Sequence, residues 1–331
     1  MSNTRRNPAR PARPARPARP VRPQPTNFRQ RHPMVMALIP VALVMVALVT
    51  MVAIKTSTGS GFASASPPSP SPSPSPSPTS TATGGRAAAS GDGATALPAG
   101  VLSAVTSVQP SVLAAVGDPA ALNPPARVSG HPAILEDAAG QPEIVYIGAE
   151  YCPYCAAERW AVVVALSRFG TFTGLSATHS STTDVDPDTK TFSFYGSTYS
   201  SPYLDFTPVE EETNQPDGST YVPLQAPTRA ESSLLSTYDA APYTSVPGSI
   251  PFLDIGNKYL VIGASFSPQV LQGLGMNTIA RDLSDPSSVV AEAIDGTANQ
   301  ITAGICAITG NQPSSVCDSA AIAAIAKKLG A

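Results

Sequence analysis

Two cysteines, Cys152 and Cys155, are separated by two residues in the sequence AEYCPYCAAERW. Such a pair can form a redox-active disulfide, supply half of a metal site or close a small structural loop. A zinc site needs four ligands, and the nearest histidines in sequence, His131 and His179, stand isolated. A disulfide across so short a loop constrains little of the unfolded chain. We therefore expect a redox pair, with no metal and no cofactor.

The pair stands between a predicted strand and a predicted helix. Residues 143–148, EIVYIG, are rich in β-branched and aromatic side chains, which indicates a buried strand. Residues 156–169 are apolar on most faces, which indicates a buried helix, and Gly170 is placed as its C-cap. Pro153 suits the first helical position, where no amide hydrogen is needed. The cysteines therefore occupy a tight turn between strand and helix.

This placement makes the two cysteines unequal. Cys152 would face the positive end of the helix, where free amides and the helix dipole lower the pKa of a thiol. Cys155 lies one turn further in and would be more shielded. We predict that Cys152 attacks a substrate sulfur and that Cys155 resolves the mixed disulfide.

The residues around the pair resemble the thioredoxin superfamily. VYIGAEYCPYCA is similar to its strand and active-site turn, and SIPFLDIGNKYLVIG is similar to its cis-proline loop and hairpin. The resemblance implies that Pro251 is a cis residue and that the backbone of Ile250 binds an extended substrate chain. The implied substrate cleft consists of Tyr151, Pro153, Tyr154, Ile250 and Pro251.

The chain departs from the thioredoxin pattern at two positions. Tyr151 stands where thioredoxins carry a tryptophan, and Tyr146 stands where many have a buried aspartate that assists proton transfer. The Pro-Tyr pair between the cysteines is similar to that of glutaredoxins. As a whole, the region after residue 96 resembles the family called domain of unknown function 929 (DUF929).

About 80 residues separate the helix from Pro251, more than a minimal thioredoxin uses. TFTGLSATHSS predicts the second sheet strand, and TFSFYGSTY with LDFTPVEEE predicts two further strands joined by YSSPY. Their aromatic side chains predict a half-buried hairpin, with a partner-docking surface as the alternative. These are Phe192, Phe194, Tyr195, Tyr199, Tyr203 and Phe206. Residues 184–190, DVDPDTK, lack the glycine and glutamate of a calcium loop and predict a solvated turn.

The C-terminal region is predicted to be helical, in the segments SVVAEAIDG, NQITAGICAIT and SSVCDSAAIAAIAKKLG, with Gly330 as a stop. Cys306 and Cys317 flank the turn TGNQP between helices. We expect them to form a structural disulfide, which would stabilise the fold by about 3 kcal/mol. A second redox pair that relays electrons to Cys152 is the alternative.

Four segments follow from composition. Residues 1–33 are rich in Arg and Pro and predict a disordered cytoplasmic tail, and residues 34–54 contain no charge and predict one transmembrane helix. Residues 55–96 are rich in Ser and Pro and predict a disordered linker. The alternative to a membrane anchor at residues 34–54 is a signal peptide that is cleaved at residues 63–65. Residues 97–331 form the folded domain. The predicted fold class is α/β: a thioredoxin-like ectodomain with a central mixed sheet, flanking helices, an insertion and a helical C-terminus.

Charge sets the predicted orientation. Nine arginines precede residues 34–54, which places the N-terminus in the cytoplasm and the folded domain on the extracytoplasmic side of the cell membrane. The rest of the chain holds 11 basic and 23 acidic residues, which argues against nucleic acid as a ligand. We expect a membrane-anchored thiol-disulfide oxidoreductase acting on exported protein thiols with an unknown redox partner. The alternative is a non-catalytic thioredoxin-like interaction or sensor module.

Overall fold

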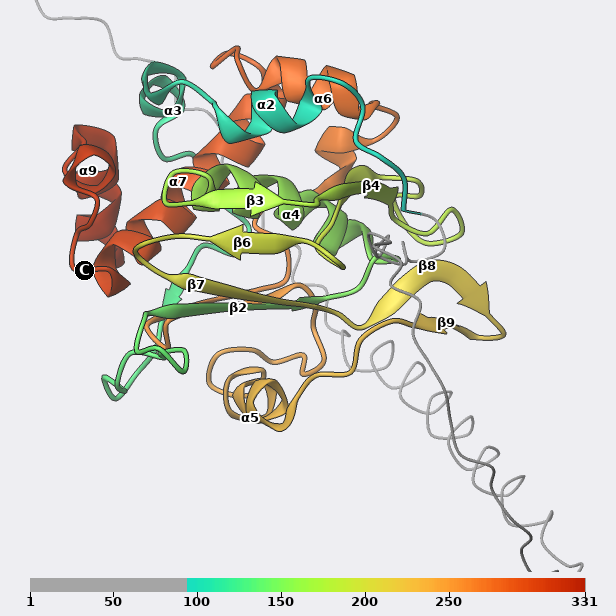
Figure 1. The fold of residues 1–331 in the computed structure, drawn as a ribbon, viewed down its shortest axis with the longest axis horizontal. Helices are drawn as coiled ribbons and strands as arrows, with labels where there is room; N and C mark the ends of the chain where they lie inside the picture. Colours follow the sequence, from blue (N-terminus) through green and yellow to red (C-terminus); the bar gives the residue numbers. More distant parts are fainter. Residues whose placement is uncertain (1–93, 331) are drawn as a thin grey trace, which may run out of the picture. The chain divides into compact units, whose positions relative to one another are not determined.

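The computed structural model describes residues 94–330 (Figure 1). The predicted cytoplasmic tail, the transmembrane helix at 34–54 and almost all of the linker lie outside these residues. Within the described part, no helix is long and apolar enough to cross a bilayer.

A five-stranded mixed sheet forms the centre of the domain, with strand order β1-β11-β10-β2-β7. Strands β2 and β7 pair in parallel, and the other neighbours pair antiparallel. The five strands are β1 (Ala126–Arg127), β2 (Glu143–Gly148), β7 (Asp205–Glu210), β10 (Phe252–Ile255) and β11 (Tyr259–Ile262). The predicted strand at 143–148 is confirmed as β2.

Both faces of the sheet are covered, so β2 is apolar on both sides. Ile144 and Tyr146 pack into the larger core, which helices α4 (Pro153–Leu166) and α7 (Val289–Ile308) complete. Val145 and Ile147 pack into a smaller core on the opposite face. Helix α5 (Arg229–Tyr238) covers that second face (Figure 1). A strand covered on both faces reads as a continuous apolar run, because neither set of side chains meets water.

The β10–β11 hairpin forms as predicted. Its turn residues Gly256 and Asn257 have φ values of 62° and 57°, the left-handed conformation that a tight two-residue hairpin turn requires. Phe252 of β10 pairs with Ile147 of β2. This register places Pro251 beside the point where β2 leaves the sheet toward the cysteines.

The insertion differs from the prediction. Residues 171–181 do not add a strand to the central sheet; they form β3 (Thr171–Thr173) and β4 (Ser176–His179) in separate two-stranded sheets. The partners of β3 and β4 are β6 (Thr198–Ser200) and β5 (Lys190–Ser193), respectively. The predicted pairing of TFSFYGSTY with LDFTPVEEE is therefore wrong, because β7 pairs in parallel with β2. A further hairpin, β8 (Glu212–Asp217) with β9 (Thr220–Pro223), follows.

The aromatic side chains of the insertion fill the larger core. Phe192, Phe194 and Phe206 are buried, and Tyr199 and Tyr203 pack against the same cluster. Phe194 makes an edge-to-face contact with Tyr146 on β2, with ring centroids 5.1 Å apart. These contacts leave the three phenylalanines unavailable as a docking surface.

Helices dominate both ends of the described chain. At the N-terminal end these are α2 (Val101–Thr106) and α3 (Pro110–Val116); at the C-terminal end they are η1 (Pro268–Leu271), α6 (Met276–Asp282), α7, α8 (Ser314–Cys317) and α9 (Ala320–Leu329). The first two predicted C-terminal helical segments merge into α7, whose N-cap Ser288 accepts a hydrogen bond from the Val290 amide. Gly330 ends α9 in the left-handed conformation, as predicted.

Candidate functional site

Helix α4 starts at the cysteine pair. Cys152 is its N-cap residue, and Pro153 takes the first helical position, as predicted. The Cys152 sulfur accepts a hydrogen bond from the Cys155 amide, at 3.3 Å. The sulfur thus takes the place that a serine or aspartate oxygen often has at a helix start. The helix ends at Leu166 with Ser167 as its C-cap, so the prediction of Gly170 as the cap is wrong.

Both cysteines are free thiols, and both lie largely inside the protein. Cys152 is 5% exposed and Cys155 is 0% exposed. The order of exposure is the one predicted, but Cys152 is more covered than its helix position alone suggested. The Ile250 carbonyl oxygen, 3.9 Å from the Cys152 sulfur, accepts a hydrogen bond from its thiol. The Ile250–Pro251 bond is cis.

The structure brings the predicted cleft residues together around Cys152, with unequal exposure. Tyr154 is exposed, while Tyr151 and Ile250 are half-buried. Pro153 and Pro251 are buried, so their side chains support the turn from inside. The surface that a partner can touch is therefore formed by the two tyrosines and Ile250.

The two thiols have opposite electrostatic environments. The pKa of Cys152 lies below its usual value, chiefly because the Cys155 thiol donates a hydrogen bond to the Cys152 sulfur. The amides of Cys155 and Tyr154 and the charge of Arg159 act in the same direction, while burial opposes them. The pKa of Cys155 lies well above its usual value, first because the thiol is buried and then because Cys152 is close. Of the two thiols, Cys152 therefore loses its proton at the lower pH, and Cys155 keeps its proton to a higher pH.

A buried ion pair lies behind the cysteines. Arg159 on α4 donates two hydrogen bonds to the Glu210 carboxylate at the end of β7, from Nε at 2.8 Å and from Nη2 at 2.6 Å. Nη2 also donates to the Ala149 carbonyl at 2.8 Å. Both side chains are 0% exposed. A bidentate pair of this kind offsets much of the cost of burying two charges.

Sequence reasoning missed both members of this ion pair. A signal was present for Arg159, because a charged residue within an otherwise apolar helix must find a partner when it is buried. Arg159 also follows Cys155 by four residues, which places the two on one face of α4. The sequence around Glu210 predicts a strand but contains no local feature that marks this residue as a buried partner of Arg159.

Two further carboxyl groups near the start of α4 are buried. Glu158 accepts hydrogen bonds from the Ser265 amide at 2.8 Å and the Ser265 hydroxyl at 3.0 Å, and burial raises its pKa to about 7. Glu150 bonds to the Ser193 hydroxyl, and burial raises its pKa also. These carboxyl groups fasten the turn and the helix to neighbouring loops.

The β8–β9 hairpin reaches the cysteine turn. The ring of Tyr221 on β9 stacks on the ring of Tyr151, with centroids 4.1 Å apart and planes 4° apart. The Glu150 amide donates to the Glu212 carbonyl at 2.9 Å. Burial, chiefly, and then the charge of Cys152 raise the pKa of Tyr151 to about 12. The hairpin thus forms one wall beside Cys152.

The other cysteines are bonded to each other. Cys306 near the end of α7 and Cys317 in α8 form the predicted disulfide, with Cα atoms 5.6 Å apart. In the described part of the chain, no group of three or more His, Cys, Asp or Glu side chains is placed to hold a metal ion.

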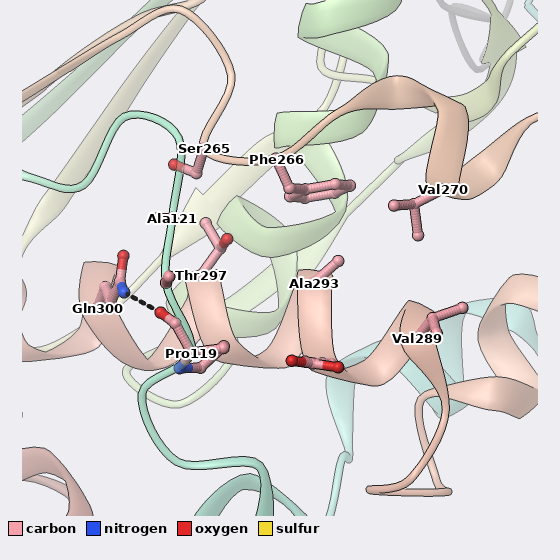
Figure 2. Close-up of a pocket in the computed structure, with 11 residues that line it drawn as sticks. Pro119, Ala121, Ser265, Phe266, Val270, Val289, Ala293, Thr297 and Gln300 are labelled. Atoms are coloured by element: carbon pink, nitrogen blue, oxygen red, sulfur yellow. Dashed lines mark hydrogen bonds between the residues drawn. The ribbon is translucent and has the colours of Figure 1, made fainter. Parts of the chain in front are cut away.

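A pocket of about 220 Å³ lies elsewhere, between α7 and the segments at 119–121 and 265–270 (Figure 2). Phe266 and Val270 line one side, and Val289 and Ala293 of α7 line the other. Gln300 closes one end and donates a hydrogen bond to the Pro119 carbonyl at 3.0 Å. Neither free cysteine lines this pocket, so it is separate from the cysteine site.

Comparison with known proteins identifies a family without an assigned activity. A family model described as Domain of unknown function (DUF929) matches residues 136–307. The match spans β2, the cysteine pair, the β10–β11 hairpin and nearly all of α7, and it ends before Cys317. No curated protein and no solved structure matches the chain.

Proposed function

The chain belongs to the DUF929 family, and we propose that it is a membrane-anchored, extracytoplasmic thiol-disulfide oxidoreductase whose reactive pair is Cys152 and Cys155. The observation that carries the proposal is the unequal environment of the two thiols. Cys152 caps a helix and has a lowered pKa, whereas Cys155 is fully buried and has a raised pKa. A purely structural pair needs no such difference.

The exchange proceeds in two steps. The Cys152 thiolate attacks one sulfur of a substrate disulfide, forming a mixed disulfide and releasing the other substrate sulfur as a thiolate, which takes a proton from water. Cys155 then loses its proton and attacks the Cys152 sulfur. The second substrate sulfur leaves and is protonated. The substrate disulfide has been reduced to two thiols, and Cys152 and Cys155 have been oxidised to a disulfide; the reverse reaction oxidises a substrate.

The fold proposed for this chemistry is thioredoxin-like. Its support is the path from β2 through the cysteine turn into α4, together with the β10–β11 hairpin that enters the sheet beside β2. The Ile250 carbonyl lies against the Cys152 sulfur and can accept a hydrogen bond from an extended substrate chain once the thiol has reacted. Tyr151, Tyr154 and Ile250 then form the contact surface of the cleft.

The trapping experiment uses two matched variants. In the Cys155→Ser variant, mixed disulfides through Cys152 should accumulate, because the resolving thiol is gone. In the Cys152→Ser variant they should not, because Cys155 is 0% exposed and its pKa is raised. Non-reducing gels of cell extracts compare the two. Equal trapping, or none in either variant, contradicts the proposal.

A non-catalytic interaction or sensor module is the second candidate, because Cys152 is only 5% exposed. The rate of alkylation against pH separates the candidates. A reactive Cys152 should titrate below about 8.5, the value of a free thiol, because its thiolate is stabilised in the fold. An inert pair should react slowly and only at higher pH.

A further inference from the structure

In the second step of the proposed exchange, Cys155 must form a thiolate at a buried position, where the charged form is disfavoured. Cys155 is fully buried, and burial raises the pKa of its thiol well above the usual value. Once Cys152 is bound in a mixed disulfide, Cys155 must still ionise before it can attack. Some group near its sulfur must therefore stabilise the negative charge.

Tyr146 is a candidate on the sheet side of Cys155. A carbon atom added at Gly148 would lie 2.8 Å from the Tyr146 Cζ and 3.0 Å from the Cys155 sulfur. The Tyr146 phenol and the Cys155 thiol therefore both lie next to the Gly148 backbone. Because Gly148 has no side chain, the two groups can lie on either side of this position. The Tyr146 hydroxyl is buried and makes no hydrogen bond to any residue between 94 and 330. An unpaired buried hydroxyl costs free energy, so its presence in a folded protein calls for an explanation such as a functional role.

Arg159 approaches the same place from α4. It lies one turn beyond Cys155, and its Cζ is 5.9 Å from the centre of the Tyr146 ring. Glu210 and the Ala149 carbonyl hold Nε and Nη2, while the buried Nη1 has no partner in the described structure. The guanidinium thus keeps one free donor in the buried cluster that contains Tyr146 and Cys155.

We propose that the Tyr146 hydroxyl donates a hydrogen bond to the Cys155 thiolate during the second step, with the Arg159 guanidinium supplying the compensating positive charge. The inference rests on the proposed oxidoreductase function. Cys155 releases its proton to water before it attacks, and the departing substrate sulfur takes up a proton from water, so that overall Cys155-SH and the mixed disulfide become the Cys152–Cys155 disulfide and a substrate thiol. Tyr146 keeps its own proton throughout.

The Tyr146 hydroxyl stays protonated at neutral pH, so it can donate a hydrogen bond but cannot act as a base. The pKa of the Tyr146 phenol lies well above 10, chiefly because the side chain is buried. The titratable groups around Cys155 are Tyr146 on β2, Tyr151 and Cys152 in the turn before α4, Arg159 on α4, and Glu210 on β7, which faces the cluster through Arg159. Among them, Tyr146 and Arg159 are the two with a buried donor that has no hydrogen-bond partner in the described structure.

The experiment follows both steps with 5,5′-dithiobis(2-nitrobenzoic acid) and mildly reduced full-length protein that contains two free thiols. Attack by Cys152 releases a first thionitrobenzoate in a phase that depends on reagent concentration. Attack by Cys155 releases the second in a phase that does not. The Cys155→Ser variant should release only the first, which assigns the phases.

In the Tyr146→Phe variant the second phase should slow about tenfold or more at neutral pH, and its apparent pKa should rise by roughly one unit, since one hydrogen bond to a charged group is lost. The first phase should not change. Tyr259→Phe is the matched control, because Tyr259 is also fully buried with an unpaired hydroxyl but lies at the turn end of the β10–β11 hairpin. Its two phases should equal those of the wild type.

Two results overturn the inference alone, and a third overturns the proposed function with it. An unchanged second phase in Tyr146→Phe shows that the hydroxyl does not stabilise the thiolate, and equal slowing of both phases shows a general structural effect. A wild-type protein with no rapid first phase contradicts the oxidoreductase function itself, and the inference falls with it. The three outcomes are distinguishable within one set of traces.

Discussion

At the scale of single residues, the site is a set of groups whose burial shifts their protonation. The same desolvation that raises the pKa of Cys155 also raises that of Glu158, Asp254 and Asp295, each of the three carboxyl groups to about 7. Cys152 escapes this effect because hydrogen bonds from the helix start and from Cys155 outweigh its burial. Local donors, more than exposure, therefore distinguish the two thiols.

Glu158 provides a test of this electrostatic picture through stability. Its pKa in the folded protein, about 7, lies above the unfolded value of 4.5, so the folded state binds more protons between these values. The contribution of Glu158 to stability is therefore fully present below pH 4.5 and is lost as the pH rises through 7. In the Glu158→Gln variant, the fall in unfolding free energy between pH 5 and pH 7.5 should shrink by about 1 to 3 kcal/mol.

Urea denaturation at the two pH values measures this difference. Asp285→Asn is a suitable control, because Asp285 is exposed and accepts hydrogen bonds from Ser287, and these bonds lower its pKa. An unaltered pH dependence in Glu158→Gln would mean that the buried carboxyl group is ionised in the folded protein at neutral pH.

At the scale of elements, the cysteine turn is positioned by three connections. Strand β2 delivers the chain to Gly148, α4 starts at Pro153, and β10 brings Ile250 beside Cys152. The β8–β9 hairpin adds Tyr221 against Tyr151. Helix α7 lies behind these elements, packed against α4, and its far end carries the disulfide to α8.

This disulfide should be structural. It closes a loop between residues separated by 11 positions, which on the loop-entropy account stabilises the fold by about 3 kcal/mol. The double variant Cys306→Ala with Cys317→Ala should lose about that much unfolding free energy in urea, while the thionitrobenzoate release from Cys152 should stay unchanged.

Mild reduction of the wild-type protein provides the complementary measurement. Mass spectrometry of alkylated peptides should show Cys152 and Cys155 labelled while Cys306 and Cys317 remain bonded. Reduction of the Cys306–Cys317 bond under the same mild conditions, together with slower thiol-disulfide exchange by the double variant, would instead favour the relay.

At the scale of the whole molecule, the proposal places the cysteine domain outside the cell membrane. Nine arginines precede the uncharged segment 34–54, whereas the following forty residues contain only Lys55 and Arg86 as basic residues. Such asymmetry orients single-pass proteins with the basic side in the cytoplasm. A domain on the extracytoplasmic side lies in an oxidising environment, in which the disulfide between Cys306 and Cys317 can persist.

Protease accessibility tests this orientation. Protease added to intact cells, after any outer barrier has been opened, should digest the cysteine domain and leave the arginine-rich tail protected. An epitope at each end of the chain reports the two outcomes separately. Removal of the N-terminal epitope alone would reverse the assigned orientation.

Local features of the site follow from sequence alone because they depend on neighbouring residues. The β2 strand, Pro153 at the helix start, the Gly256–Asn257 turn and the Cys306–Cys317 pairing each have a short-range signal in composition or spacing. The predicted cis bond at Pro251, drawn from a family resemblance, is also present.

Tertiary structure decided which elements become neighbours. Residues 204–212 look like a hairpin strand in sequence, yet β7 pairs in parallel with β2, and this pairing alone brings Glu210 to Arg159. Alternation of apolar residues indicates that a strand has a buried face but does not name its partner. The contacts of Tyr151 with Tyr221 and of Tyr146 with Phe194 join residues that are far apart in the chain. Such contacts depend on the packing of the whole domain, for which one sequence carries no local signal.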